Sequence, residues 1–207
     1  MKPRTSVKLV TGPAAEPVTL AEAKAWAKID TTEDDALLAV LITTAVQAAE
    51  EYTRRSFITQ THRLTLDSMG GINDWLPEGT YDLPVSSLSG GLPTSIDLPR
   101  PPLASVTSIT TYSSAGTSAV YSSANYFVDA DGARVNLYES ASWPSDLRAQ
   151  KACEVVYVAG YGATSSSVPS PIKTAILMHV QTMYDSRIVC EMPDACMSLL
   201  NRYKIYG

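Results

Sequence analysis

The sequence predicts an α+β fold in which a small helical bundle is interrupted by an antiparallel β-sheet or sandwich. Residues 33–55 repeat their apolar side chains with helical periodicity, and helical patterns return between residues 171 and 201. Between them, short alternating stretches are separated by Gly, Ser, Pro and Asp, which is typical of strands and turns. The predicted parts are an arm (1–16), a helical bundle (17–57 and 163–201), a β insert (58–162) and a C-terminal tail (202–207).

The composition fits a globular protein and argues against a DNA-reading one. The chain has 207 residues, 45% of them hydrophobic, which is enough for one large domain or two small ones with a real core. Its formal net charge is −5, and residues 58–162 carry the whole excess, with ten acids against five bases. Such a protein lacks the basic surface of a sequence-specific DNA binder, although DNA could pass it without being held.

Targeting signals and cysteines point to a reducing compartment. The basic N-terminus is not followed by an apolar stretch, so no secretion signal is expected, and no window approaches the roughly 20 apolar residues of a membrane span. Three cysteines, Cys153, Cys190 and Cys196, are an odd and sparse set. They fit reduced thiols in a cytosolic protein better than a disulfide framework.

The N-terminal arm is expected to have little structure of its own and to be ordered by a partner, since only residues 7–10 resemble a strand. Helical signals begin where Thr19 and Glu22 have the spacing of a capping box, which predicts a short helix ending near Lys28. The acids of residues 33–35 then stand where the first turn of the long helix favours them.

The long helix, from Glu33 to about Arg55, has an apolar arc of roughly 200°, twice the width that one packing partner requires. Either it is the central helix of its own bundle, or a neighbouring copy of the chain covers part of the arc. The second interpretation assigns four residues to a subunit interface: Leu38, Ile42, Val46 and Ala49. If the subunit itself buries these residues, the helix provides no argument for an oligomer.

The β insert is expected to contain strands at 61–67, 81–85, 96–98, 106–112, 126–128, 134–137 and 154–158. Its clearest hairpin turns through residues 129–132, Asp-Ala-Asp-Gly, whose residue types suit positive φ. A calcium loop is the rival interpretation, but the characteristic acid spacing and the closing Glu are absent. Residues 68–95, rich in Gly, Ser and Pro, give no clear pattern.

After the insert, Ser170 can cap a helix whose first position suits Pro171 and which ends near Arg187. Pro193 opens a short last helix to about Asn201. The final residues form a basic and aromatic tail that is too short to fold by itself.

The sequence offers little for catalysis. It contains no nucleophile elbow, Walker loop or dinucleotide fingerprint. Of its two histidines, His62 lies on a predicted strand and His179 on an apolar helix face, so an enzyme that uses either as a base is a minor alternative. Cys190 and Cys196 lack the spacing of a zinc site. We therefore predict no catalytic residue, no metal and no cofactor.

Five short motifs, in order, carry a family resemblance. They are residues 17–24 (PVTLAEAK), 58–61 (ITQT), 98–103 (LPRPPL), 157–162 (YVAGYG) and 168–173 (VPSPIK). Together with the acidic start of the long helix, they span about residues 17–185. This order resembles that of the head–tail connector (adaptor) proteins of long-tailed bacteriophages and gene transfer particles.

The resemblance implies a structural protein of the virion neck, assembled in the host cytoplasm. It implies a homo-oligomeric ring, usually dodecameric, that docks under the portal protein and extends the DNA channel toward a head-completion (stopper) or tail-terminator protein. Double-stranded DNA would pass without sequence-specific binding, and no membrane is involved. The segment expected to insert into the portal comprises Arg202, Tyr203, Lys204, Ile205 and Tyr206.

A second hypothesis is a β-sandwich binding module on the virion surface. In this case exposed aromatic residues of the insert would bind a host glycan, and the candidates are Trp75, Tyr81 and Trp143.

Overall fold

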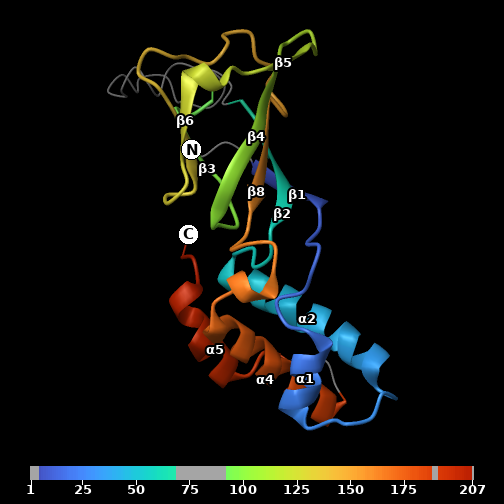
Figure 1. Cartoon of the computed structure of the whole chain (residues 1–207). Helices are drawn as coiled ribbons and strands as arrows, with labels where there is room; N and C mark the ends of the chain where they lie inside the picture. The colour runs from blue at the N-terminus through green and yellow to red at the C-terminus, as the bar shows by residue number, and fades with distance from the viewer. Residues whose placement is uncertain (1–4, 69–91, 188–190, 207) are drawn as a thin grey trace, which may run out of the picture. The chain divides into compact units, whose positions relative to one another are not determined.

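The computed structural model describes residues 5–68, 92–187 and 191–206, and its α+β class is the predicted one (Figure 1). The chain divides into two compact units. We call Met1–Thr11, Thr61–Pro99 and Leu103–Val158 the sheet unit. Gly12–Gln60, Arg100–Pro102 and Ala159–Gly207 form the helical unit.

The sheet unit contains two sheets. The first has the strand order β1-β2-β8-β4-β5 and the second the order β3-β7-β6. The strands of the first sheet are β1 (Thr5–Thr11), β2 (Gln60–Leu66), β8 (Cys153–Ala159), β4 (Leu103–Tyr112) and β5 (Ser118–Val120). Those of the second are β3 (Ser95–Asp97), β7 (Arg134–Leu137) and β6 (Tyr126–Asp129). Every predicted strand within the described residues is thus confirmed, the hairpin included, while the expected strand at 81–85 lies outside them.

Alternating burial forms the core of the sheet unit. Every second residue of β2 and β8 is buried, which is the pattern of strands with one covered face. The largest fully buried side chain in this core is Tyr157, whose hydroxyl donates a 2.8 Å hydrogen bond to the Pro99 carbonyl. A buried tyrosine is therefore satisfied within its own unit.

The β6–β7 hairpin turns as the sequence predicts. The Asp129 carboxylate accepts a hydrogen bond from the Gly132 N–H at 2.9 Å and pairs with Arg134 at 2.9 Å. These contacts lower the pKa of Asp129, with the Gly132 bond the larger cause. The carboxylate is thus engaged by the turn itself.

Residues 5–11 were expected to belong to an arm with little structure, and this expectation is wrong. They form β1, which pairs antiparallel with β2 from Thr5 opposite Leu66 to Thr11 opposite Thr61. The edge of β2 supplies the backbone partners that this segment lacks when considered alone. The sequence pattern at residues 7–10 marked only the centre of the strand.

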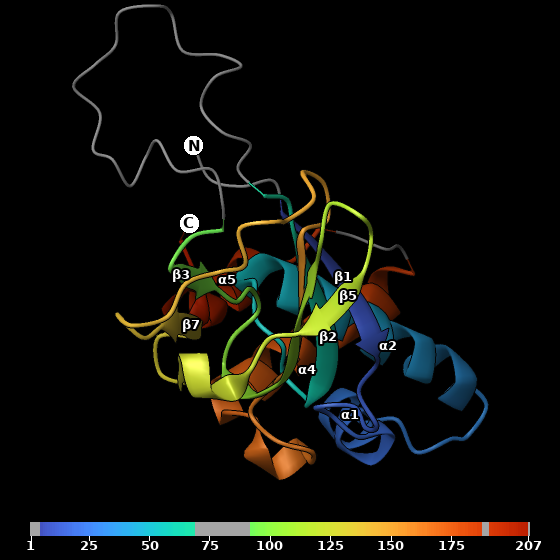
Figure 2. The same ribbon diagram turned by 90° about the horizontal axis from the view of Figure 1, so that it is seen from above.

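The helical unit contains α1 (Leu20–Ala27), α2 (Asp35–Thr53), α4 (Ser170–Ser186) and α5 (Asp194–Leu200), seen from two directions in Figure 1 and Figure 2. The predicted capping box is present, because the Thr19 hydroxyl accepts from the Glu22 N–H at 3.2 Å and the Glu22 carboxylate accepts from the Thr19 N–H at 2.7 Å. No helix that the structure describes is long and apolar enough to cross a membrane.

One predicted cap is wrong. Ser170 is already helical, and Pro169 stands at the N-cap position of α4 without a side-chain hydrogen bond. Pro171 thus occupies the second helical position instead of the first. Either position tolerates proline because the first N–H groups of a helix have no partner within it.

The assignment of Leu38, Ile42, Val46 and Ala49 to a subunit interface is also wrong. All four are at most 6% exposed and belong to the core of the helical unit. Helix α2 packs against α1, α4 and α5, so three partners together cover the wide arc. The width of the apolar arc therefore gives no argument for an oligomer.

The start and end of the β insert meet through close backbone contacts within the helical unit. Gly160 donates to the Pro102 carbonyl at 2.9 Å, Tyr161 donates to the Phe57 carbonyl at 3.0 Å, and Thr59 donates to the Gly162 carbonyl at 3.0 Å. A Cβ at Gly160 would lie 2.5 Å from the Thr59 nitrogen, and the φ of this glycine is +139°. Only glycine fits this approach.

Glu50 fastens the last turn of α2 to the same region. One carboxylate oxygen, Oε1, accepts from the Phe57 N–H at 2.7 Å and from the Gln60 side-chain amide at 2.9 Å. Burial raises the pKa of the Glu50 carboxyl above its ordinary value of 4.5, and nearby Glu16 acts in the same direction. The two hydrogen bonds and the charge of Arg100 oppose this shift without cancelling it.

Replacing Gly160 with alanine is expected to destabilise the helical unit by about 3 kcal/mol or more, since a positive φ and a backbone clash add up. The matched control is Gly116→Ala. Gly116 also has a positive φ, +83°, but nothing lies within 4 Å of its added Cβ, so it should cost only about 1 kcal/mol. Denaturant unfolding followed by circular dichroism measures both, and equal losses would contradict the proposed clash.

Replacing Glu50 with glutamine should stabilise the protein at neutral pH. The amide keeps an Oε1 acceptor for both hydrogen bonds. In the wild type, the raised pKa means that the folded state keeps the Glu50 carboxyl proton to higher pH than the unfolded chain does. The free energy of unfolding therefore falls as the pH rises from 4.5 through the pKa of the folded state. The variant should therefore match the wild type below pH 4.5 and exceed it at pH 7.

The control for the change in net charge is Glu51→Gln, on the exposed side of α2. Unfolding free energies of the three proteins across this pH range provide the measurement. Parallel curves for Glu50→Gln and the wild type would refute the role assigned to burial.

Candidate functional site

The first half of α2 exposes an apolar surface. We define the α2 patch as Ala36, Leu37, Ala39 and Val40, which are all exposed. Val40 is 63% and Leu37 is 37% exposed. The opposite side of the same turns carries Leu38, Leu41 and Ile42, which are buried. The helix is therefore apolar on two sides, and its own unit covers only one of them.

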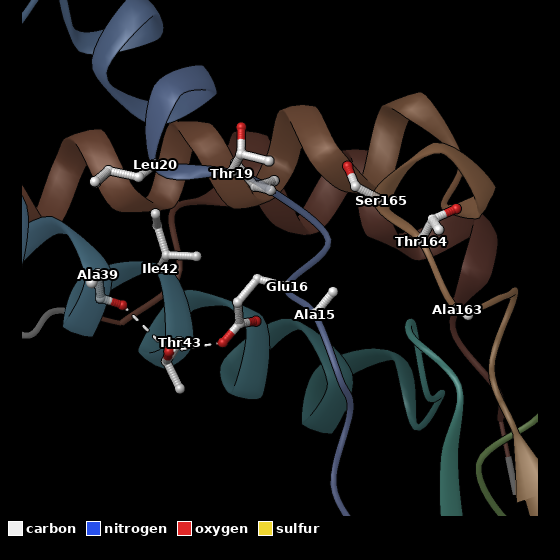
Figure 3. Close-up of a pocket in the computed structure, with 11 residues that line it drawn as sticks. Ala15, Glu16, Thr19, Leu20, Ala39, Ile42, Thr43, Ala163, Thr164 and Ser165 are labelled. Carbon is white, nitrogen blue, oxygen red and sulfur yellow. Dashed lines mark hydrogen bonds between the residues drawn. The ribbon is translucent and has the colours of Figure 1, made fainter.

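A pocket of about 400 Å³ lies beside the patch (Figure 3). It is built from the segment before α1, from α2 and from the turn at 163–165. Ala39 belongs to both the patch and the pocket, so the two form one continuous surface. The lining residues are Ala15, Glu16, Val18, Thr19, Leu20, Ala39, Ile42, Thr43, Ala163, Thr164 and Ser165.

Hydrogen bonds fix the walls of the pocket. The Thr43 hydroxyl donates to the Glu16 carboxylate at 2.9 Å, with Glu16 pointing toward Thr43 in Figure 3. The Ser165 hydroxyl donates to the Pro17 carbonyl at 2.7 Å, which ties the turn to the segment before α1. Glu16 is the sole ionisable lining residue. The pocket thus suits an apolar side chain of a partner, with one carboxylate at its wall.

The two histidines considered for catalysis belong to different units. His62 belongs to the sheet unit, where its ring centroid lies 5.6 Å from that of Tyr157. His179 is buried among the core residues of α4. Burial raises the pKa of Cys153 to about 12, so its thiol stays neutral at physiological pH. Within the described ranges there is no group of three or more His, Cys, Asp or Glu residues that could hold a metal ion; Cys190 lies outside them.

The C-terminal tail is anchored at the end of α2. The Ile205 N–H donates to the Thr53 carbonyl at 3.1 Å, and the Arg55 side chain donates to the Tyr203 carbonyl. The ammonium group of Lys204 lies 4.1 Å from the centroid of the Tyr52 ring. The carbonyls of the last helical turn lack partners within the helix, and the Ile205 N–H supplies one for the Thr53 carbonyl. The tail, which is too short to fold by itself, is thus supported by its own subunit.

The five residues predicted to bind a portal have different surroundings. Tyr203, Lys204 and Ile205 are partly buried, whereas Arg202 and Tyr206 are exposed, Tyr206 to 76%. Their contact with a portal stays a prediction. Among the large hydrophobic side chains of the described residues, Tyr206 is the most exposed.

The glycan hypothesis requires exposed aromatic side chains, and Trp143, which the structure describes, does not offer a free binding surface. The Trp143 indole N–H donates to the Pro93 carbonyl at 2.9 Å, and its ring centroid lies 4.6 Å from that of Tyr121. Trp143 is therefore part of the packing of the sheet unit. Trp75 and Tyr81 lie outside the described residues.

Sequence reasoning missed the α2 patch. Val40 interrupts an otherwise polar stretch that includes Thr43, Thr44 and Gln47, and this lone valine was the available signal. Nothing in the sequence pattern indicated the pocket, because its walls come from segments more than 100 residues apart in the chain, such as Glu16 and Ser165.

Comparisons with known proteins agree with the resemblance. Residues 17–90 match the family model of the phage gp6-like head-tail connector protein. A comparison with curated proteins gave no match.

Solved structures with a similar fold come from gene transfer agent (GTA) particles. A chain in the virion of the native GTA particle is 21% identical, with a TM-score of 0.71 over 97% of this chain and 96% of that one. A chain in the neck of the empty particle, computed with C6 symmetry, is 21% identical, with a TM-score of 0.71 over 98% of this chain and 96% of that one. A chain in the neck of the native particle, computed with C12 symmetry, is 20% identical, with a TM-score of 0.69 over 98% of this chain and 96% of that one. The predicted resemblance is thereby confirmed: residues 17–90 match the head–tail connector family, and the chain shares the fold of GTA neck proteins.

Proposed function

We propose that this chain is a structural head–tail connector that forms a ring, of twelve copies by analogy with the C12 neck, beneath the portal of a virion. In this role it extends the DNA channel and carries out no catalysis. The observation that carries the proposal is the continuous surface of α2 patch and pocket on the helical unit. The family match at residues 17–90 supplies the class of assembly.

The α2 patch suits contact with a second copy of the chain. In a ring, each copy presents one surface to the neighbour on one side and a different surface to the neighbour on the other. Val40 and Leu37 are aliphatic side chains one helical turn apart, and burying each would contribute roughly 1.5–3 kcal/mol. The adjacent pocket can receive an apolar side chain, which is the arrangement of interface hot spots.

The charge of the chain suits a channel protein. Its excess of acids lies in residues 58–162, and DNA, itself a polyanion, would be repelled weakly and not retained. We infer that DNA passes through the ring without sequence-specific contacts. The same role places the chain in the virion neck, after assembly in the host cytoplasm, with a stopper or tail-terminator protein on its tail side.

The C-terminal tail is proposed to bind the portal. Its backbone is held by Thr53 and Arg55, so Tyr206 projects from a supported segment. A supported aromatic side chain loses less conformational entropy on binding than one on a free tail. Tyr206 is thus the anchor and Arg202 a flanking cation.

Replacing Val40 with glutamate should prevent ring assembly while leaving the fold intact. Val40 is 63% exposed, so the unfolding free energy should change by less than about 0.5 kcal/mol. Burying the new carboxylate against a neighbour should reduce assembly by about tenfold or more. Negative-stain electron microscopy and native mass spectrometry, after co-expression with the portal protein from the same source, measure the copies in each ring.

The matched control for Val40→Glu is Gln47→Glu. Gln47 is exposed on the same helix, and its replacement adds the same charge outside the α2 patch. Normal rings with Gln47→Glu and none with Val40→Glu are expected. Normal rings with both would refute the role of the patch.

Replacing Tyr206 with alanine should weaken attachment to the portal by about tenfold, as expected for loss of one aromatic anchor. The fold should be unaffected because the side chain is 76% exposed. Tyr138→Ala, at an exposed tyrosine of the sheet unit, is the control. Co-purification with the portal provides the measurement, and equal retention of both variants would exclude Tyr206 as the anchor.

A further inference from the structure

Helix α1 exposes a tryptophan. Trp26 stands in the last turn of the helix and is 42% exposed. It belongs neither to the core of the helical unit nor to the partly buried side chains that pack against this core, whereas Leu20 and Ile29, at either end of the helix, do pack there. The other exposed residues of α1 are Ala21 and Ala25. A large aromatic ring thus projects beside two small side chains, which allow a partner to approach it closely.

The chemistry of tryptophan defines what can receive this ring. Its indole is apolar apart from one N–H donor, and it has no acceptor. A buried indole N–H usually finds a hydrogen-bond partner, as that of Trp143 does at the Pro93 carbonyl, 2.9 Å away. Tryptophan is also enriched among interface hot spots. A site that receives Trp26 should therefore be apolar and offer one acceptor.

The pocket beside the α2 patch meets both requirements (Figure 3). Its volume is about 400 Å³, enough for a bicyclic ring, and its walls include Val18, Leu20 and Ile42. The acceptor is the Glu16 carboxylate. The Thr43 hydroxyl donates to its Oε1, and a carboxylate has about four acceptor positions, so a further donor can be accommodated. An inserted indole N–H would satisfy a carboxylate that apolar cover alone would leave without water.

Trp26 and the pocket lie on different sides of α1. Leu20 lines the pocket and Trp26 does not. Six positions along an α-helix correspond to about 9 Å of rise and about 120° of rotation. A contact that closes a ring joins two different surfaces of identical copies. The α2 patch with its pocket is one such surface, and the exposed side of α1 can supply the other.

Few other exposed apolar side chains of the described residues suit the pocket. In the helical unit they are Leu37 and Val40, which belong to the α2 patch itself, and Tyr206 on the tail. In the sheet unit they are aliphatic and lack a donor, or belong to the pair Phe127 and Tyr138, whose ring centroids lie 5.5 Å apart. Trp26 combines an unpacked ring with a donor on a helix of the same unit as the pocket.

The charges on α1 do not oppose its approach to Glu16. Glu22 and Lys24, the charged residues of the helix, form ion pairs of 2.6 Å and 2.7 Å within their own subunit. Lys28 and Asp30, which follow the helix and are exposed, carry opposite charges. The exposed side of α1 itself is uncharged, so Glu16 would meet no acid there.

We propose that Trp26 of one copy inserts into the pocket of the next copy, where its indole N–H donates to the Glu16 carboxylate. The occupant of the pocket is thus a second copy of this chain. The proposal rests on the ring proposed above and identifies the surface that the α2 patch and its pocket receive.

The test is disulfide trapping between two full-length single-site variants assembled on the portal protein from the same source. Ala25→Cys places a thiol beside Trp26, and Ala15→Cys places one at the pocket; both positions are exposed. The matched control replaces Ala15→Cys with Gln47→Cys, which is exposed on α2 outside the patch and the pocket. All chains carry Cys190→Ser, and the two remaining native cysteines are buried.

The pair of Ala25→Cys and Ala15→Cys should give mixed disulfides about tenfold faster than the control, since docking raises the effective concentration of the thiols. Adding Trp26→Ala to the first chain removes the ring, and adding Ala163→Phe to the second fills the pocket. Either change should reduce the rate to that of the control. Ala163 is exposed, so its replacement tests the docking even if Trp26→Ala folds poorly. A rate equal to the control from the start, or one that Ala163→Phe leaves high, would overturn the proposal.

The hydrogen bond to Glu16 has its own measurement. Trp26→Phe keeps an aromatic ring but loses the N–H, and it should reduce ring assembly about tenfold, as expected for a bond to a charged group. In a Glu16→Ala background the same change should cost only about threefold, for the smaller ring. Equal losses in both backgrounds would refute this bond.

The outcome is separable from that of the proposed function. Rings that assemble and respond to Val40→Glu, but cross-link only at the control rate, would leave the connector function standing and overturn the docking of Trp26. Rapid cross-linking that depends on Trp26, in pairs of copies that never form rings, would support the docking and contradict the ring.

Discussion

The helical unit depends on the backbone contacts that bring two distant parts of the chain together. Residues before position 60 supply α1 and α2, and residues after 159 supply α4 and α5. Between them the chain leaves for the sheet unit and returns. The bonds of Thr59 to Gly162 and of Tyr161 to Phe57 fix the two parts side by side. Because α2 and α4 bury each other, an error at this junction would expose the core of both.

This junction also explains how α2 can pack against its own unit on one side and expose an apolar surface on the other. Glu50 secures the last turn of α2, and α4 and α5 cover the arc that contains Leu38 and Ile42. The first half of the helix is thereby held rigidly with its other side exposed. A surface on a rigid element costs little entropy when it binds a partner. The α2 patch is consequently better suited to recognition than the same residues on a loop would be.

Local chemistry was predictable from the sequence, and long-range pairing was not. The capping box of Thr19 and Glu22 and the turn after Asp129 depend on residues within a few positions of one another, and both form as expected. Strand β1 was underestimated because its partner lies more than 50 residues away, and β5 gave no signal in three residues. The four residues assigned to an interface are core residues, since helical periodicity identifies an apolar side without identifying what covers it.

The same limit explains why the sequence did not predict the α2 patch. A helical wheel treats Val40 as an interruption, and only the packing of α2 shows that Leu37 and Ala39 remain uncovered beside it. The pocket likewise arises from Glu16, Thr43 and Ser165, which belong to three separate segments. Such a site can be identified only when the structure shows which residues of a helix are buried by neighbouring elements and which remain exposed.

In the proposed ring, the contact between copies is small. The α2 patch has four residues, whereas a stable interface between two proteins usually buries about 800 Å² on each partner. Copies that meet in dilute solution would therefore separate readily. A portal that binds several tails at once would hold the copies at a high local concentration, and each weak contact would then become effectively intramolecular. Assembly would in this way be confined to the place where the connector is needed, with the anchored tail as the first point of attachment.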